Sequence, residues 1–181
     1  ITIVGVGVIA EDLAPKCKAF NMTVYGVSGT KRDVPGFDRM FGRDELIKAA
    51  SLSDYLLLLV PYSAETDKLV DADVLAAMKP DAYIVNLARG GVLDEDALMD
   101  VLRAGKIAGA GLDVFAERPL PSDHPFWSMD NVLITPQVGG MSATYQDQMV
   151  PILEQNIRHF LRREFDKMVN VVDHRLLDAP A

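Results

Sequence analysis

The first ten residues, ITIVGVGVIA, constrain the fold of this chain more than any other stretch. A short apolar run leads directly into Gly5 and Gly7, and the small residue Ala10 stands three positions further on. This is the G-x-G-x-x-G/A pattern, in which a strand turns into a helix around a pyrophosphate. Gly5 permits the tight turn, Gly7 lets an anion approach the backbone, and Ala10 lets the helix pack on the strand. The pattern predicts a dinucleotide site, with a purely structural glycine turn as the alternative.

The predicted contact with the anion is made by the backbone at the start of the helix. Val8 and Ile9 follow Gly7 directly. The first N–H groups of a helix have no partner within the helix, and they lie at the positive end of its dipole. We therefore expect the amides of Val8 and Ile9 to bind the pyrophosphate.

Short apolar runs recur along the chain, with helix-like segments between them. Strands are expected at 1–4, 23–27, 55–60, 82–85, 108–112 and 132–134. Helices are expected at 11–20, 43–50, 73–78 and 94–104, and a final long helix is expected after a cap at Ser142. Continuous apolar runs are typical of parallel strands covered on both faces. The chain is thus predicted to be α/β, with a doubly wound parallel sheet (Rossmann fold) and long irregular loops at 28–40 and 115–131.

The end of the second expected strand bears on the choice of cofactor. An acid about 20 residues beyond the glycine loop typically binds the adenosine ribose of NAD. That place is held here by Ser28, and the cations Lys31 and Arg32 follow it. Cations there would neutralise a 2′-phosphate, whereas the alternative is that both are solvated loop charges. We expect NADP or NAD as the cofactor, with NADP favoured.

Charge and composition argue against several classes of partner. A net charge of -8 disfavours a nucleic-acid-binding surface and gives no polybasic membrane patch. No apolar run approaches the roughly 20 residues needed to cross a bilayer. The single cysteine, Cys17, excludes an internal disulfide and a thiolate-rich metal site, and the three histidines are scattered. We expect a cytoplasmic protein without a bound metal. Because the chain opens directly on a core strand, we also expect that a preceding segment has been lost or was not recorded.

Five motifs carry a family resemblance. The central motif is VNLARGGVLDEDAL at 85–98. VGVGVIA and LVPYSAETDKLVD precede it, and AGAGLDVFAERPLP and NVLITPQVGG follow it. Together they resemble the D-isomer-specific 2-hydroxyacid dehydrogenases over essentially the whole chain. The resemblance implies an NAD(P)-binding domain at 1–163 and a tail at 164–181 that would return to a substrate, or lid, domain largely missing here. It also implies a small 2-oxo or 2-hydroxy acid substrate and a homodimer.

The resemblance further implies roles for individual residues. Arg89 matches the family's substrate arginine, whose guanidinium forks onto a carboxylate; the alternative is an arginine that holds its own loop through carbonyl groups. Asp113 matches the acid that orients the nicotinamide, with a simple turn cap as the alternative. The other positions expected beside the cofactor are Pro61, Thr66, Leu87, Ala88, Gln137, Gly139 and Gly140.

Two positions depart from the family's pattern. The family has a proton-exchanging histidine where this chain has Gln137, and a glutamate where it has Arg118, with Glu117 one residue early. Glutamine cannot exchange a proton near neutral pH. The catalytic candidates are therefore Arg89, Glu117 and Gln137. Three hypotheses stay open: an oxidoreductase that moves a hydride between nicotinamide and a 2-oxo acid, a nucleotide-binding module without turnover, and an inactive piece of an active enzyme.

Overall fold

The computed structural model describes residues 1–30 and 33–171. The predicted contacts of Lys31 and Arg32 lie outside these described residues. The chain divides into two compact units, Ile1–Gln137 and Val138–Ala181, and each is described here by itself. The boundary expected between residues 163 and 164 stays a prediction.

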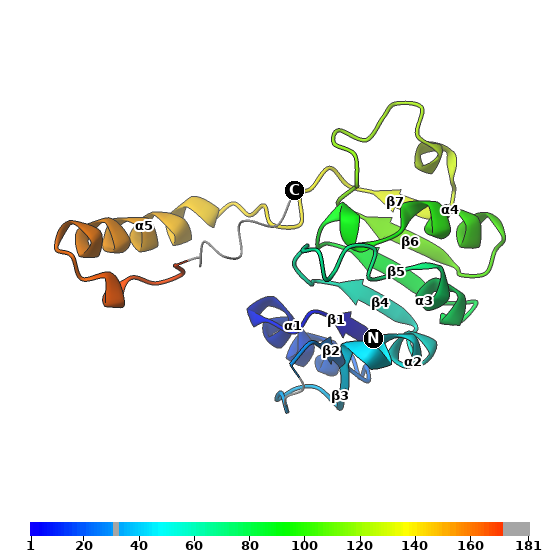
Figure 1. The fold of residues 1–181 in the computed structure, drawn as a ribbon, viewed down its shortest axis with the longest axis horizontal. Helices are drawn as coiled ribbons and strands as arrows, with labels where there is room; N and C mark the ends of the chain where they lie inside the picture. Colours follow the sequence, from blue (N-terminus) through cyan, green and yellow to red (C-terminus); the bar gives the residue numbers. More distant parts are fainter. Residues whose placement is uncertain (31–32, 172–181) are drawn as a thin grey trace. The chain divides into compact units, whose positions relative to one another are not determined.

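The first unit is built on one parallel sheet, which has seven strands in the described part of the chain (Figure 1). The strands are β1 (Thr2–Val4), β2 (Tyr25–Ser28), β3 (Arg39–Gly42), β4 (Tyr55–Leu58), β5 (Tyr83–Asn86), β6 (Gly109–Leu112) and β7 (Val132–Ile134). Their order across the sheet is β3-β2-β1-β4-β5-β6-β7, and every neighbouring pair is parallel. The chain therefore winds outward in both directions from β1 and β4, which confirms the doubly wound fold.

Helices cover both faces of this sheet. They are α1 (Val8–Ala19), α2 (Leu46–Ser51), α3 (Ala72–Ala77) and α4 (Glu95–Arg103), with short 3-10 turns η1 (Arg43–Glu45), η2 (Gly90–Val92) and η3 (Pro125–Ser128). Neighbouring residues of a strand point to opposite faces. Ile3 accordingly packs in one apolar cluster with Ala10 and Cys17 of α1, whereas Val4 packs in a second cluster with residues of α2, α3 and α4.

Three sequence predictions about the elements were wrong. Strand β3 was not predicted, and it begins inside the loop expected at 28–40. Its only apolar side chains are those of Met40 and Phe41, so the sequence shows little periodic signal there. Helix α1 begins at Val8 rather than at residue 11, with Gly7 as its N-cap, and runs through Pro15 to Ala19. Ser142 does not cap the last helix; Thr144 is its N-cap and makes no side-chain capping bond.

The described part of the second unit contains helix α5 (Tyr145–Leu161) and a short return that includes η4 (Phe165–Lys167). Asn156 fixes this return to the helix, because its side chain donates to the carbonyl of Val169 at 2.8 Å and accepts from the Val169 amide at 2.9 Å. The His159 ring meets Glu164 at 2.8 Å, and the hydrogen bonds from Lys167 and His159 lower the Glu164 pKa to about 2.

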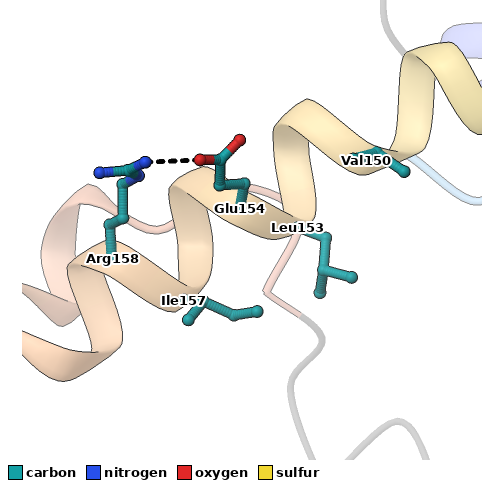
Figure 2. Close-up of a pocket in the computed structure, with 5 residues that line it drawn as sticks. All are labelled: Val150, Leu153, Glu154, Ile157 and Arg158. Carbon is teal, nitrogen blue, oxygen red and sulfur yellow. Dashed lines mark hydrogen bonds and ion pairs between the residues drawn. The ribbon is translucent and has the colours of Figure 1, made fainter.

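Helix α5 carries a shallow, largely apolar hollow on its own surface. All five side chains that line it project from this helix, and an ion pair joins two of them (Figure 2): Val150, Leu153, Glu154, Ile157 and Arg158. None of them is a predicted site residue.

Among the helices of residues 1–30 and 33–171, none combines the length and the apolar character that a membrane span requires.

Candidate functional site

The turn after β1 has the geometry that the glycine pattern predicts. Gly5 has a φ of +95°, and a Cβ atom there would lie 2.4 Å from the backbone nitrogen of Val60, so only glycine fits. Its amide donates to the carbonyl of Val27 at 2.9 Å, which ties the turn to the end of β2. Ala10 is fully buried against the strand, as expected of the small third position.

The start of α1 is open. A Cβ atom on Gly7 would meet no heavy atom within 4 Å. The first helical hydrogen bond runs from the amide of Glu11 to the carbonyl of Gly7 at 2.9 Å, so the amides of Val8 and Ile9 precede it. Val8 and Ile9 are 83% and 70% exposed. This turn can therefore receive an anion close to the backbone.

The end of β2 holds hydroxyl groups. The Ser28 hydroxyl accepts a hydrogen bond from the Thr30 amide at 3.3 Å. The guanidinium of Arg43 lies against Gly29, which stands between Ser28 and Thr30. Arg43 was not among the predicted site residues, because its position depends on β3, which the sequence prediction missed. The signal in the sequence is the Gly-Arg pair directly after Met40 and Phe41.

The loop after β4 is shaped by Thr66. Its side chain is buried, and its hydroxyl donates to the carbonyl of Pro61 at 2.8 Å while it accepts from the Ser63 amide at 2.7 Å. Pro61 itself is exposed at the strand end. Thr66 thus fixes the loop in which Pro61 is presented, and a direct contact of either residue with a cofactor stays a prediction.

The loop after β5 is organised by Asn86, which the sequence prediction missed. This buried side chain accepts from the amide of Ala88 at 3.0 Å and donates to the carbonyl of Arg89 at 3.1 Å. Ala88 is buried as a result, whereas Leu87 is 43% exposed. The guanidinium of Arg89 is at the surface and donates to the carbonyl of Ala88 at 2.7 Å.

The bond from Arg89 to the Ala88 carbonyl is of the kind expected if this arginine only holds its own loop. It uses only part of the hydrogen-bonding capacity of the guanidinium, however. A guanidinium has five N–H donors, and one bond to a backbone carbonyl leaves the fork capable of holding a carboxylate. Gly90 then brings the loop against the end of the next strand, because a Cβ atom there would lie 1.9 Å from the carbonyl carbon of Phe115. Arg89 and Asp113 are thereby held on neighbouring segments.

Asp113 follows β6 and is buried. Its carboxylate accepts a hydrogen bond from the Thr135 hydroxyl at 2.5 Å, and its amide donates to the carbonyl of Asn86 at 3.1 Å. Thr135 is a further residue that the sequence prediction missed, although it stands directly before the Pro-Gln pair. This bond orients the carboxylate of Asp113, whose oxygens can only accept hydrogen bonds when it is ionised.

The two positions that depart from the family's pattern contact one another. A nitrogen (Nη1) of Arg118 donates to Oε1 of Gln137 at 3.1 Å, and both side chains are exposed. Gln137 has a φ of +55°, a left-handed conformation that is uncommon for residues other than glycine. Arg118, rather than the neighbouring Glu117, is the residue that contacts Gln137. The pair can donate hydrogen bonds to an oxygen but has no group that titrates near neutral pH.

The loop that carries Arg118 is anchored by Glu95, at the start of α4. Its carboxylate accepts from the Ala116 amide at 2.9 Å. Burial is the main cause that raises the Glu95 pKa, and the Ala116 bond opposes it. The adjacent Asp94 behaves in the opposite way, because its ion pair with Lys68 at 3.0 Å lowers the Asp94 pKa.

The sheet brings most predicted residues to one edge. Since all strands are parallel, the carboxyl ends of β1, β2, β4, β5 and β6 lie at that edge, where a doubly wound sheet binds its ligands. The residues that follow these ends include Gly5, Pro61, Leu87 and Asp113. Gly139 and Gly140 belong to the second unit, so their predicted position beside the cofactor stays a prediction. The described residues contain no cluster of three or more histidine, cysteine or acidic side chains able to hold a metal.

Comparison with known proteins gives consistent matches. Residues 1–139 match the family model described as D-isomer specific 2-hydroxyacid dehydrogenase, NAD binding domain. A glyoxylate reductase from Pyrococcus furiosus is 37% identical over 164 residues, which are 91% of this chain and 48% of that protein. The chain spans about half the length of the curated relatives it matches.

Two solved structures extend the match to three dimensions. A D-isomer-specific 2-hydroxyacid dehydrogenase from Xanthobacter autotrophicus, in complex with NADPH and MES, superposes with a TM-score of 0.88 at 34% identity. That match covers 97% of this chain and 71% of the other. An NADPH-dependent glyoxylate/hydroxypyruvate reductase from Sinorhizobium meliloti, in complex with NADP and sulfate, gives 0.85 at 29% identity, over 97% of this chain and 55% of the other.

Proposed function

The chain belongs to the D-isomer-specific 2-hydroxyacid dehydrogenase family, and from this premise we propose that it is the dinucleotide-binding part of an NAD(P)-dependent reductase of small 2-oxo acids. Glyoxylate and hydroxypyruvate are the candidate substrates, because relatives of this chain are named for them. The single observation that carries the proposal is the open turn at Gly7, where a ligand can reach the first amides of α1.

The residues at the sheet edge fit a nicotinamide dinucleotide. The space beside Gly7, which a side chain would fill, suits the pyrophosphate, and the amides of Val8 and Ile9 would hold it. Asp113 would accept from the carboxamide, since its carboxylate is already oriented by Thr135. When bound, the nicotinamide supplies or accepts a hydride. Supporting contacts would come from Ser28, Pro61, Thr66, Leu87 and Ala88.

The substrate acid would be held by Arg89. Its guanidinium is exposed on a loop that Asn86 and Gly90 make rigid, so it can fork onto a carboxylate. Gln137 would hold the substrate's 2-oxygen. Its Oε1 already accepts from Arg118, which leaves the amide N–H groups to donate to that oxygen. Glu117 lies beside Arg118 and is the carboxylate nearest in sequence to the family's glutamate position.

A second candidate is a nucleotide-binding module without turnover. The Arg118–Gln137 bond favours it, because the two positions contact one another and neither can donate and accept a proton near neutral pH. Loss of positioned acid–base catalysis typically costs a factor of about 10²–10⁴ in rate. The two candidates therefore share a binding site and differ in turnover.

Binding and turnover measurements separate these proposals. Calorimetric titration with NADPH and NADH is expected to give saturable binding for at least one of them, and the absence of any binding would contradict both candidates. Oxidation of the coenzyme is then followed with glyoxylate, hydroxypyruvate and pyruvate, in this chain and in the full-length protein wherever its sequence extends further. Turnover supports the reductase, whereas binding without turnover supports the module.

Restoring the family's acid–base pair gives a sharper test. The double substitution Gln137→His and Arg118→Glu is expected to raise the reductase rate by about 10²-fold, the lower end of the usual acid–base contribution. The new rate should depend on pH near the histidine pKa. Gln137→Asn serves as the matched control, since it alters the side chain without adding a titrating group. An unchanged rate in a variant of the full-length protein, lid domain included, that still binds coenzyme would contradict the roles assigned to these positions.

Self-association as a homodimer and a cytoplasmic location also stay proposals that rest on the family resemblance. Light scattering coupled to size-exclusion chromatography tests the first of them.

A further inference from the structure

An arginine from outside the expected loop lies at the end of β2. Strands β2 and β3 are in register with Ser28 opposite Gly42, so the residues that follow them, Gly29 and Arg43, are neighbours. Nη2 of Arg43 lies 3.1 Å from the position that a Cβ atom on Gly29 would take. A side chain at Gly29 would therefore require the guanidinium to shift by a few tenths of an ångström, and the glycine lets it lie close to the backbone.

The guanidinium also spans to the loop that follows β4. Its Nη1 donates to Oε2 of Glu65 at 3.1 Å. The side chain of Arg43 is 35% exposed, whereas that of Glu65 is 81% exposed. The arginine is thus the fixed partner and the glutamate the solvated one. Exposed ion pairs of this kind are weak, so a stronger anion can replace Glu65.

The chemistry around this arginine favours an anion over a ribose hydroxyl. Ser28 and Thr30 bring hydroxyl groups that can donate, and the Ser28 position holds no carboxylate, which an NAD-type site typically uses for the ribose. A phosphate dianion accepts two parallel N–H bonds from a guanidinium, and it carries more charge than the carboxylate of Glu65. The arrangement therefore suits a phosphate group attached to the adenosine ribose.

We infer that Arg43 selects dinucleotides with a 2′-phosphate, and that Glu65 is the counter-ion which this phosphate displaces. This inference rests on the proposed function, because it places the ribose at the end of β2. It assigns to Arg43 the selective role that the sequence pattern gave to Lys31 and Arg32.

The test uses two ligands that differ only in the group concerned, adenosine 2′,5′-bisphosphate and adenosine 5′-monophosphate, titrated calorimetrically into the whole chain. The bisphosphate is expected to bind at least about tenfold more tightly, the usual value of a hydrogen bond to a charged group. Arg43→Gln should abolish this preference and leave monophosphate affinity within about twofold. Arg39→Gln is the matched control, since Arg39 lies in β3, the strand that Arg43 directly follows, but stacks on the Phe41 ring at 4.3 Å, and it should keep the preference.

Further variants examine the counter-ion and the residues predicted from sequence. Glu65→Gln is expected to raise bisphosphate affinity by about threefold, the size of a weak surface ion pair, without changing monophosphate affinity. If this variant instead bound the bisphosphate more weakly, the claim that the phosphate displaces Glu65 would be wrong. If Lys31→Gln with Arg32→Gln abolishes the preference while Arg43→Gln keeps it, the assignment to Arg43 is wrong.

The remaining outcomes separate this inference from the proposed function. Wild-type protein that binds both nucleotides equally overturns the inference alone, whereas protein that binds neither overturns the dinucleotide site and the inference with it. Equal losses for both ligands in Arg43→Gln would show a structural role. Should that variant fail to fold, Arg43→Lys decides, because it keeps the charge without the fork: a loss confined to the bisphosphate supports the inference, and an unchanged ratio overturns it. NADPH and NADH, titrated in parallel, should follow the same pattern.

Discussion

Two loops of the first unit depend on glycine at the end of a strand, and they use it for opposite purposes. After β1, a side chain on Gly7 would meet no protein atom within 4 Å. After β5, a side chain on Gly90 would lie 1.9 Å from the Phe115 carbonyl carbon. The first glycine keeps space clear for something other than protein, whereas the second lets two protein segments touch.

This difference suggests two separate roles in the proposed site: the turn after β1 would receive the ligand, and the loop after β5 would hold the Arg89 side chain in position. Under the proposed function, the open turn would offer the amides of Val8 and Ile9 to the pyrophosphate, so the role of Gly7 would be to keep that space free of side-chain atoms. The closed loop is packed by Asn86 and Gly90, and it holds the exposed guanidinium of Arg89 in place. Rigid support for a charged group is what substrate positioning requires. Substitutions in the two loops should therefore be separable by stability and by binding.

The largest expected effect belongs to Gly90→Ala. The added methyl group would overlap backbone atoms of Phe115 and Ala116, which cannot turn aside as a side chain could. We expect the free energy of unfolding to fall by about 3 kcal/mol, the upper range for overpacking a well-packed site. Urea denaturation followed by circular dichroism measures this change. A loss below about 0.5 kcal/mol, the range of a neutral surface substitution, would mean that the loop is not closed against Phe115.

A smaller effect of a different kind is expected for Gly7→Ala. The Gly7 backbone is extended, with φ of -123° and ψ of -166°, so alanine fits and stability should change by less than about 1 kcal/mol. Coenzyme affinity should nevertheless fall about tenfold, or about 1.4 kcal/mol, because the methyl group occupies the space of the pyrophosphate. Calorimetric titration of both glycine variants checks the contrast. Unaltered affinity in a folded Gly7→Ala protein would show that the open turn does not receive the dinucleotide.

The open turn was predictable from sequence, and the closed loop was not. Gly5, Gly7 and Ala10 have fixed spacing after a strand, and each spacing has a local steric reason. The importance of Gly90 comes from Phe115, 25 residues later, so no local pattern reveals it. The same holds for Asn86, whose side chain bonds are visible only once the loop is folded.

The sheet was predicted with one strand too few, and the reason also affects the site. Six strands have apolar runs, but β3 is an edge strand whose partner is β2, and only Met40 and Phe41 mark it. Without β3, Arg43 had no predicted position beside Gly29. Interactions across neighbouring strands, such as Thr135 with Asp113, were missed for the same cause, because register is set by packing rather than by the residues themselves.

The smallest expected effect concerns the pH dependence of the closed loop. Burial raises the Glu95 pKa, so the folded state keeps a proton at pH values where the unfolded state has lost it. Glu95 therefore contributes stability that is fully present below its unfolded pKa and is lost as the pH rises through its folded pKa. Glu95→Gln keeps an acceptor for the Ala116 amide but does not titrate. Its free energy of unfolding should thus rise relative to that of the wild type between pH 4 and pH 7, by about 1 kcal/mol or less, because the carboxylate is partly solvated.

The neighbouring Asp94 provides the matched control with the opposite sign. Its pKa is lowered by Lys68, so its contribution is present above the unfolded pKa and is lost as the pH falls through the folded pKa. Asp94→Asn still offers an oxygen to the Ala97 amide at the start of α4, where Asp94 now accepts at 3.2 Å. Urea denaturation of both variants and the wild type at several pH values should give differences of opposite slope. Parallel slopes would contradict the view that burial beside Ala116, rather than charge pairing, governs the carboxylate that anchors the closed loop.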